Sequence, residues 1–175
     1  KTDRSIETWG DANNGGNAGN APLNNTAEVF STSSAFAALK QDAKKQNKVR
    51  FAAYMKTLAT ELAQGKEVHE TGDGLYYYIS EQGDGPKPTK GQTVSAKYHG
   101  KFDDGRTFDK GEYSFDLITG SVVEGWHLGF AELNKGTKAT LVIPYWYGYG
   151  EQSQFQGQMP GRSTLVFDVE LVDIK

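Results

Sequence analysis

The chain has 175 residues, a formal net charge of −3, 37% hydrophobic residues and no cysteine. Its length suits one domain of about 100–150 residues with an additional segment. The acidic balance argues against a nucleic-acid-binding protein, the missing thiols exclude disulfides and cysteine nucleophiles, and no run approaches the ~20 apolar residues of a membrane-spanning helix.

Residues 1–30 are predicted to form a flexible tether. The run from Gly10 to Asn25 contains six Asn and four Gly, and this composition buries little surface and has high chain entropy. No secretory signal pattern stands at the start, so we expect the chain to begin either in the cytoplasm or after processing. The tether and the absence of cysteine favour the bacterial cell envelope or periplasm, with the cytoplasm as the alternative.

Residues 31–70 are predicted to be a helical extension. Serines and Thr32 at the start offer N-caps, and Gly65 suits a C-terminal stop. A bend is expected near Asn47, between two apolar stripes at helical spacing. The stronger stripe is Phe51, Met55, Leu58 and Leu62, and the weaker one is Phe36, Leu39 and Ala43. Such an amphipathic helix either packs on its own domain or serves as an arm for a homodimer.

Residues 72–175 are predicted to be the folded domain, because the hydrophobic period changes from 3.6 to 2. Strands are expected at 75–80, 93–98, 137–143 and 164–174. The Asp103–Arg106 segment reads as a hairpin turn, and Glu124 to Leu133 as one short helix. Strands in series with one inserted helix predict an α+β fold with an antiparallel sheet.

The usual catalytic motifs are absent from the sequence. It contains no G-x-S-x-G elbow, no H-E-x-x-H and no phosphate-binding loop. Asp103 and Asp104 read as ordinary hairpin residues, and His99 and His127 have no partners at metal-ligand spacing. We therefore expect neither a metal nor a cofactor. What remains is a set of aromatic residues near strand ends, which on its own is either a core or a site.

Five short motifs follow one another over residues 74–175. They are Lys97-Tyr98-His99-Gly100 with Asp104-Gly105-Arg106-Thr107-Phe108-Asp109, then Val122-Val123-Glu124-Gly125-Trp126, then Gly136 to Pro144, then Tyr149-Gly150, and finally Met159-Pro160 to Leu171. In kind and order this series resembles the FKBP-type peptidyl-prolyl cis-trans isomerases. The preceding Gly74–Tyr77 and Gly85–Pro88 segments resemble bacterial members that carry an N-terminal helical extension.

The resemblance implies a curved antiparallel sheet of five or six strands wrapped around one short helix, preceded by the amphipathic helical segment. The pocket of that fold lies between the short helix and the sheet. The implied catalytic residues are Tyr98, Phe108, Asp109, Trp126, Tyr149 and Phe167. The implied substrate-binding residues are Tyr113, Val122, Val123 and Met159. Trp126 would form the floor, and the Val123 N–H and the Tyr149 hydroxyl would hydrogen-bond substrate carbonyls.

The implied activity is accelerated rotation about X–Pro bonds during protein folding, with chaperone help from the helix. That rotation breaks amide resonance over a barrier of ~18–20 kcal/mol and makes no new bond, which agrees with the absence of catalytic motifs. The implied partners are proline-containing proteins or peptides and macrolide inhibitors, with no nucleic acid and no membrane span. The alternative is a non-catalytic binding or chaperone module with the same fold.

The sequence departs from the family pattern near the pocket. Tyr113 stands where many members have Phe, Met159 replaces Ile, and Gly161 replaces a second Pro. Residues 151–158 depart most. In this family that loop contacts the residue before proline and the larger ligands, so substrate preference and macrolide affinity stay open.

Overall fold

The computed structural model describes residues 33–118 and 120–175, with side chains from residue 46 onward. The chain divides into two compact units, residues 1–48 and 49–175. The predicted tether, residues 1–30, lies outside the described residues, as do the side chains of the weaker helical stripe. All packing described below belongs to the second unit.

The predicted helical extension forms one helix, α1, from Ser33 to Ala63. Its secondary structure is unbroken at Asn47, where the sequence predicted a bend. Gln64 and Gly65 follow with φ of 50° and 89°. Glycine adopts this left-handed conformation without steric cost, so the predicted stop at Gly65 is confirmed.

Six strands form a single sheet. They are β1 (His69–Thr71), β2 (Leu75–Glu81), β3 (Thr93–Phe102), β4 (Thr107–Asp116), β5 (Lys138–Ile143) and β6 (Leu165–Ile174). The spatial order is β1-β2-β5-β6-β3-β4, and every neighbouring pair is antiparallel. The predicted α+β class with an antiparallel sheet and one short helix is confirmed.

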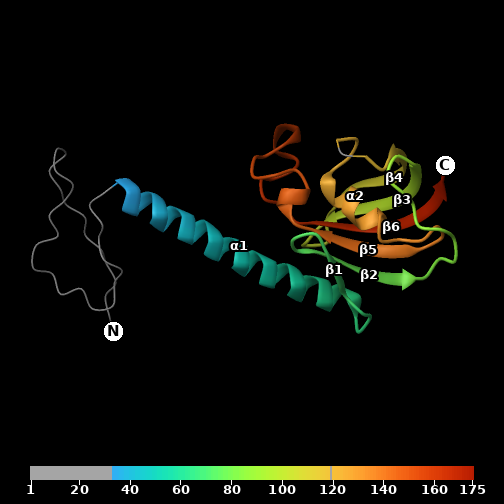
Figure 1. Ribbon diagram of the computed structural model, residues 1–175, viewed down its shortest axis with the longest axis horizontal. Helices are drawn as coiled ribbons and strands as arrows, with labels where there is room; N and C mark the ends of the chain where they lie inside the picture. Colours follow the sequence, from blue (N-terminus) through green and yellow to red (C-terminus); the bar gives the residue numbers. More distant parts are fainter. Residues whose placement is uncertain (1–32, 119) are drawn as a thin grey trace, which may run out of the picture. The chain divides into compact units, whose positions relative to one another are not determined.

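The short helix α2 runs from Glu124 to Phe130, three residues less than expected. It lies against one side of the sheet in Figure 1. Two 3₁₀ turns, η1 (Tyr145–Tyr147) and η2 (Phe155–Gly157), interrupt the connection from β5 to β6. That connection carries the sequence that departs most from the family pattern.

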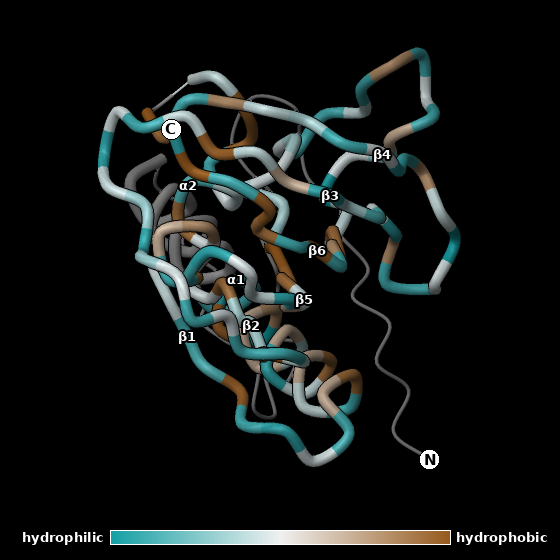
Figure 2. Tube along the Cα trace, turned by 90° about the vertical axis from the view of Figure 1, so that its right-hand side faces the viewer, coloured by the Kyte–Doolittle hydropathy of each residue, from teal (hydrophilic) through white to brown (hydrophobic). Residues whose placement is uncertain are grey.

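The two faces of the sheet carry different clusters, because side chains alternate along each strand. Figure 2 shows hydrophobic and polar residues alternating along β6. On the face toward α2, here the α2 face, Leu141 and Phe167 pack with Trp126 and Phe130. The opposite face is here the α1 face.

On the α1 face, the C-terminal half of α1 covers part of the sheet. Met55 and Ala59 are fully buried against Tyr76, Val142 and Val166. Phe51, Leu58 and Leu62 are partly buried beside them. The stronger apolar stripe of the sequence therefore packs on its own sheet, the first of the two interpretations.

Candidate active site

A cavity of about 510 Å³ opens on the α2 face. Its lining comes from β3, β4, β6, α2, the segment before α2 and the segment after η1. The lining residues are Tyr98, Phe108, Asp109, Tyr113, Gly120, Ser121, Val122, Val123, Trp126, Tyr149 and Phe167. Nine of the ten site residues implied by the sequence therefore meet at one cavity, although they are spread over 70 positions (98 to 167).

Trp126 forms the base of the cavity and is 5% exposed. Its ring centroid lies 5.2 Å from that of Tyr98 and 5.3 Å from that of Phe167, both edge-to-face. Aromatic pairs prefer such edge-to-face contacts to a face-to-face sandwich. Within the described residues the buried Trp126 Nε1–H has no acceptor. The base of the cavity is thus an apolar, closely packed aromatic surface.

The absence of a side chain at Gly100 lets two walls of the cavity meet. A Cβ at this position would lie 2.7 Å from the Phe108 ring and 2.8 Å from the Phe167 ring. Real Cβ atoms do not approach this closely, so any larger residue would displace the rings. With glycine, Phe108 and Phe167 lie 5.4 Å apart at 89°. The Tyr-x-Gly motif is therefore a packing requirement of the cavity.

Polar groups gather at the rim around Asp109. The Tyr98 hydroxyl donates to Asp109 Oδ2 at 2.8 Å, and the Lys110 N–H donates to Asp109 Oδ1 at 2.8 Å. Burial and the hydrogen bond to Asp109 raise the pKa of Tyr98 to about 12. Burial and the charge of Asp109 also raise the pKa of Tyr149. Both phenols therefore stay protonated at neutral pH, where they can donate hydrogen bonds.

Val123 lies at the rim as the N-cap of α2, with φ −57° and ψ 140°. Its carbonyl accepts the Trp126 N–H at 2.9 Å. An N-cap residue keeps its own N–H outside the helical hydrogen bonds. The Val123 N–H is thus in a position compatible with the substrate-binding role that the resemblance implies.

The tenth implied residue, Met159, does not line the cavity. It is 4% exposed and belongs to the core cluster beneath it. Its carbonyl accepts the Gln154 N–H at 2.8 Å, and the Met159 N–H donates to the Gln154 carbonyl at 3.2 Å. Met159 thus anchors the loop between η1 and β6 from below.

That loop brings an aromatic residue to the cavity that the sequence did not single out. Phe155 is 62% exposed, and its ring lies 5.5 Å from that of Tyr149 at 84°. Phe155 and Gln156 both have left-handed φ, 51° and 55°, which costs free energy for residues other than glycine. In the sequence, residues 151–158 depart most from the family pattern. That divergence pointed to this loop, but it did not indicate that the Phe155 side chain lies beside the cavity.

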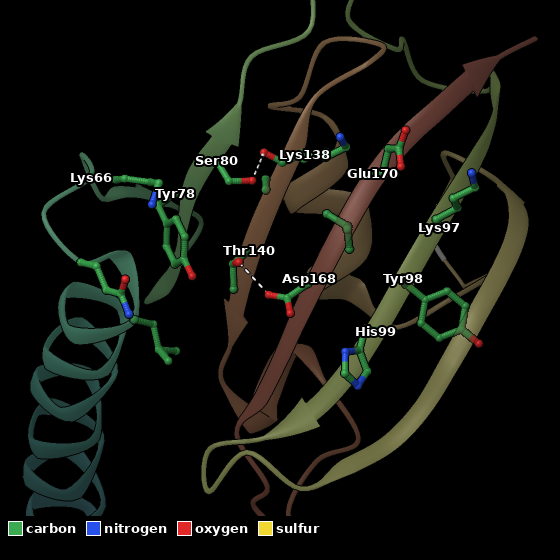
Figure 3. A pocket seen from close by; sticks show the side chains of 14 residues that line it. Lys66, Tyr78, Ser80, Lys97, Tyr98, His99, Lys138, Thr140, Asp168 and Glu170 are labelled. Atoms are coloured by element: carbon green, nitrogen blue, oxygen red, sulfur yellow. Dashed lines mark hydrogen bonds between the residues drawn. The ribbon is translucent and has the colours of Figure 1, made fainter.

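A second cavity, about 570 Å³, lies on the α1 face beside the end of α1. Figure 3 shows its polar lining, with Thr140 and Asp168 pointing toward each other from adjacent strands. The Thr140 hydroxyl and the Lys101 ammonium donate to Asp168 at 2.8 and 2.6 Å. The Asp168 carboxylate is thus paired with one cation and one hydroxyl, and the three groups come from three adjacent strands. The cavity on the α2 face is therefore the candidate active site.

Comparison with known proteins identifies the family. The sequence profile of the "FKBP-type peptidyl-prolyl cis-trans isomerase" family matches residues 85–172. The chain belongs to this FKBP family. It is 38% identical over 148 residues to the FKBP-type peptidyl-prolyl cis-trans isomerase FkpA of Escherichia coli K12, covering 82% of this chain and 52% of that protein. A probable FkpA of Neisseria meningitidis is 38% identical over 138 residues, which cover 77% of this chain and 48% of that protein.

Solved FKBP structures share the fold. The crystal structure of FkpA from Escherichia coli matches with a TM-score of 0.61 and 34% identity, over 81% of this chain and 69% of that one. A peptidyl-prolyl cis-trans isomerase from Pseudomonas syringae matches with a TM-score of 0.61 and 28% identity, over 70% and 92%. The chain spans about half the length of the curated relatives it matches. Within the described residues, no helix is both long and apolar enough to cross a membrane.

Proposed function

We propose that the chain is a peptidyl-prolyl cis-trans isomerase that binds the twisted X–Pro amide in the cavity on the α2 face and so assists protein folding. The observation that carries this proposal is the meeting of five aromatic rings and two valines around a buried Trp126, with the Asp109 carboxylate hydrogen-bonded to the Tyr98 hydroxyl at the rim. Family membership supports the same function.

The lining suits a reaction in which no bond is made or cleaved. Rotation requires loss of amide resonance, and the twisted amide carries less charge separation than the planar one. An apolar cavity therefore desolvates the twisted state at lower cost than either planar isomer, and only such differential binding accelerates a reaction. The Tyr149 hydroxyl and the Val123 N–H hold the flanking carbonyls. An acceleration of about 10⁴–10⁶ corresponds to about 5–8 kcal/mol of differential binding.

A protease-coupled assay on an Xaa-Phe-Pro peptide with the full chain tests this function. We expect isomerisation well above the uncatalysed rate. Phe108→Ala removes one wall without changing charge, and we expect kcat/KM to fall at least about tenfold. A wild-type rate equal to the uncatalysed rate would overturn the proposal. Peptide binding by Trp126 fluorescence without acceleration would instead support the non-catalytic binding module.

We propose the same cavity as the site for macrolide ligands of the rapamycin type. The aromatic walls supply apolar contact area, whereas the exposed Phe155 lies where such a ligand would extend beyond the cavity. Inhibition of the isomerase assay by rapamycin, competitive with peptide, is the expected result. Unchanged rates at saturating macrolide would contradict this assignment.

The organisation and location of the protein are also proposals. We propose a tether over 1–30, a helical extension over 31–70 and an isomerase domain over 72–175, in the bacterial cell envelope or periplasm. The bacterial origin of the FkpA relatives supports the location.

Because the 51–62 stripe is covered by the sheet, we propose that a homodimer would use the part of α1 before Val49. Sedimentation of the full chain tests this, and a monomer at all concentrations would exclude the dimer.

A further inference from the structure

The C-terminal half of α1 covers part of the sheet and also contacts two segments that lead to the candidate active site. Just before the buried Met55, two aromatic side chains of α1 contact different partners. Phe51 and Tyr54 are three positions apart, so they lie on neighbouring parts of the helix surface. Each one contacts a segment that leads directly into the candidate active site. The cavity is on the α2 face and α1 is on the other, so neither residue lines the cavity.

Phe51 packs against the η1 turn. Its ring lies 5.3 Å from Tyr145 and 5.4 Å from Trp146, both edge-to-face. The Tyr145 carbonyl accepts the N–H groups of Gly148 at 3.1 Å and Gly150 at 2.8 Å. These two bonds bracket Tyr149 and fix where its side chain starts. Phe51 thus contacts the turn whose hydrogen bonds fix the backbone on both sides of Tyr149.

Tyr54 is bonded to the β3–β4 hairpin. Its hydroxyl donates to Asp103 Oδ2 at 2.7 Å across 49 positions of sequence. The neighbouring Phe102 ring packs 5.1 Å from Phe108, the cavity wall next to Asp109. Tyr54 is 42% exposed, and water could satisfy such a hydroxyl equally well. A hydrogen bond at such an exposed site adds little to the free energy of unfolding. Because this bond joins α1 to the hairpin, we expect its main effect on the position of the hairpin.

The two held segments lead to two polar groups that both line the cavity. The hairpin leads to Asp109, and η1 leads to Tyr149. Asp109 acts on Tyr149 electrostatically and on Tyr98 through a 2.8 Å hydrogen bond. Moving either segment would therefore change the spacing between the carboxylate and the phenol.

We propose that Phe51 and Tyr54 are positioning residues, through which one turn of α1 holds η1 and the β3–β4 hairpin and so sets the spacing of Tyr149 and Asp109. This proposal rests on the proposed isomerase function for its kinetic consequence. Its structural consequence, the fixed spacing at the rim, does not depend on catalysis.

The kinetic test uses the full chain and the peptide assay. Tyr54→Phe removes only the hydroxyl, and we expect kcat to fall about 3- to 10-fold with KM nearly unchanged, because misplaced groups lower kcat steeply. Asp103→Ala should have the same effect, and Tyr54→Phe with Asp103→Ala should be no worse than either alone. Asp103→Asn keeps an oxygen acceptor and should restore the rate. Lys56→Ala, an exposed position of the same helix, is the control.

The structural test reads two backbone amides by NMR. The Lys110 N–H donates to Asp109, and the Gly150 N–H donates to Tyr145, so their signals report the two held segments. Tyr54→Phe should move the Lys110 signal, Phe51→Leu should move the Gly150 signal, and Lys56→Ala should move neither. An inactive wild-type chain would refute the proposed function, and these amide signals would then decide the positioning role.

Two results would overturn the proposal. One is a Tyr54→Phe chain with wild-type kcat and unmoved amide signals. The other is a loss of kcat that parallels a lower urea midpoint of unfolding and that persists in Asp103→Asn. Phe51 and Tyr54 would then have only a structural role.

Discussion

Asp109 accepts hydrogen bonds on both of its carboxylate oxygens, one from Tyr98 and one from Lys110. The Tyr98 ring also packs edge-to-face on Trp126. Tyr98→Phe would keep that ring and remove the donor to Oδ2, so that Asp109 loses one of the two hydrogen bonds that hold it. We expect kcat/KM for a Phe-Pro peptide to fall about 3- to 10-fold without a change in fold. Steady-state kinetics and circular dichroism measure both, and unchanged kcat/KM would show that the bond has no role.

The pH dependence of that bond follows from the pKa of Tyr98, which is raised to about 12. The folded chain binds the phenol proton more tightly than the unfolded chain, whose tyrosine has the ordinary value of 10.0. The bond therefore stabilises fully below pH 10 and is lost as the pH rises toward 12. We expect the difference between wild type and Tyr98→Phe to be constant from pH 7 to about 9, measured by urea unfolding. A difference that shrinks near neutral pH would contradict this assignment.

Phe155 lies beside the cavity, against Tyr149, and we expect it to contact the residue that precedes proline. Its ring is mostly exposed beside Tyr149, so a bound apolar side chain would bury it. Phe155→Ala should raise KM about fivefold for Leu-Pro or Phe-Pro peptides, equivalent to ~1 kcal/mol of lost apolar burial. Glu-Pro peptides should change little. Phe155→Tyr keeps the ring and serves as the control, and equal effects on all peptides would refute a specificity role.

Sequence reasoning located the cavity residues through motifs whose spacing is imposed by packing. Gly100 is an example, because its missing side chain is what lets Phe108 and Phe167 meet. The positions of Met159 and Phe155 relative to the cavity could not be predicted in this way. Both belong to a loop without periodicity, and whether a loop side chain points in or out depends on turns such as the left-handed pair at Phe155 and Gln156. No pattern in the sequence fixes that choice.

At the scale of elements, α2 contains a histidine whose ring has no hydrogen-bond partner among the described residues. His127 is 9% exposed, its two ring nitrogens have no hydrogen bond within the described residues, and it packs against Phe115. Burial lowers its pKa, and the nearby charge of Glu124 opposes this only in part. The helix therefore holds a neutral imidazole in an apolar site.

The sign of the consequence follows from proton linkage. Below the ordinary pKa of 6.5 the unfolded chain takes up a proton on this histidine more readily than the folded chain. Stability is thus complete above that pH and falls as the solution becomes more acidic. Between pH 7.5 and pH 5, the free energy of unfolding should fall less for His127→Leu than for wild type. Urea unfolding of both proteins at the two pH values measures this. Parallel losses in the two proteins would assign the acid sensitivity to other groups.

Elements with strong periodicity were predictable, and the others were not. β6 alternates between buried and less buried residues over much of its length, whereas β5 is a continuous run of buried residues, because both faces of this central strand are covered. β4 was missed as a strand because it is almost entirely exposed, with Phe115 as its one fully buried residue. β1 has three residues, too few for any alternation to be recognised. Both are edge strands, where the register comes from hydrogen bonds to a neighbour and not from a buried face.

For the whole molecule, the sequence suggested a boundary near residue 72, whereas contacts of α1 with the sheet favour a folding unit that begins earlier. A chain that starts at Val49 retains Met55 and Ala59, so we expect its unfolding free energy to match that of the full chain. A chain that starts at Glu67 retains all six strands but exposes Tyr76, Val142 and Val166. It should lose about 3–6 kcal/mol. Equal stability of the two shortened chains would show that α1 is dispensable.

The strand order also constrains how this sheet can assemble. β5 and β6 lie at its centre, yet they follow the other four strands in the sequence. The β1–β2 and β3–β4 hairpins can each form from local contacts, but they are not joined into one sheet until β5 pairs with β2 and β6 pairs with both β3 and β5. Such non-local closure is slow. During synthesis on the ribosome, the aromatic walls of the cavity would therefore stay apart until the final strand has emerged.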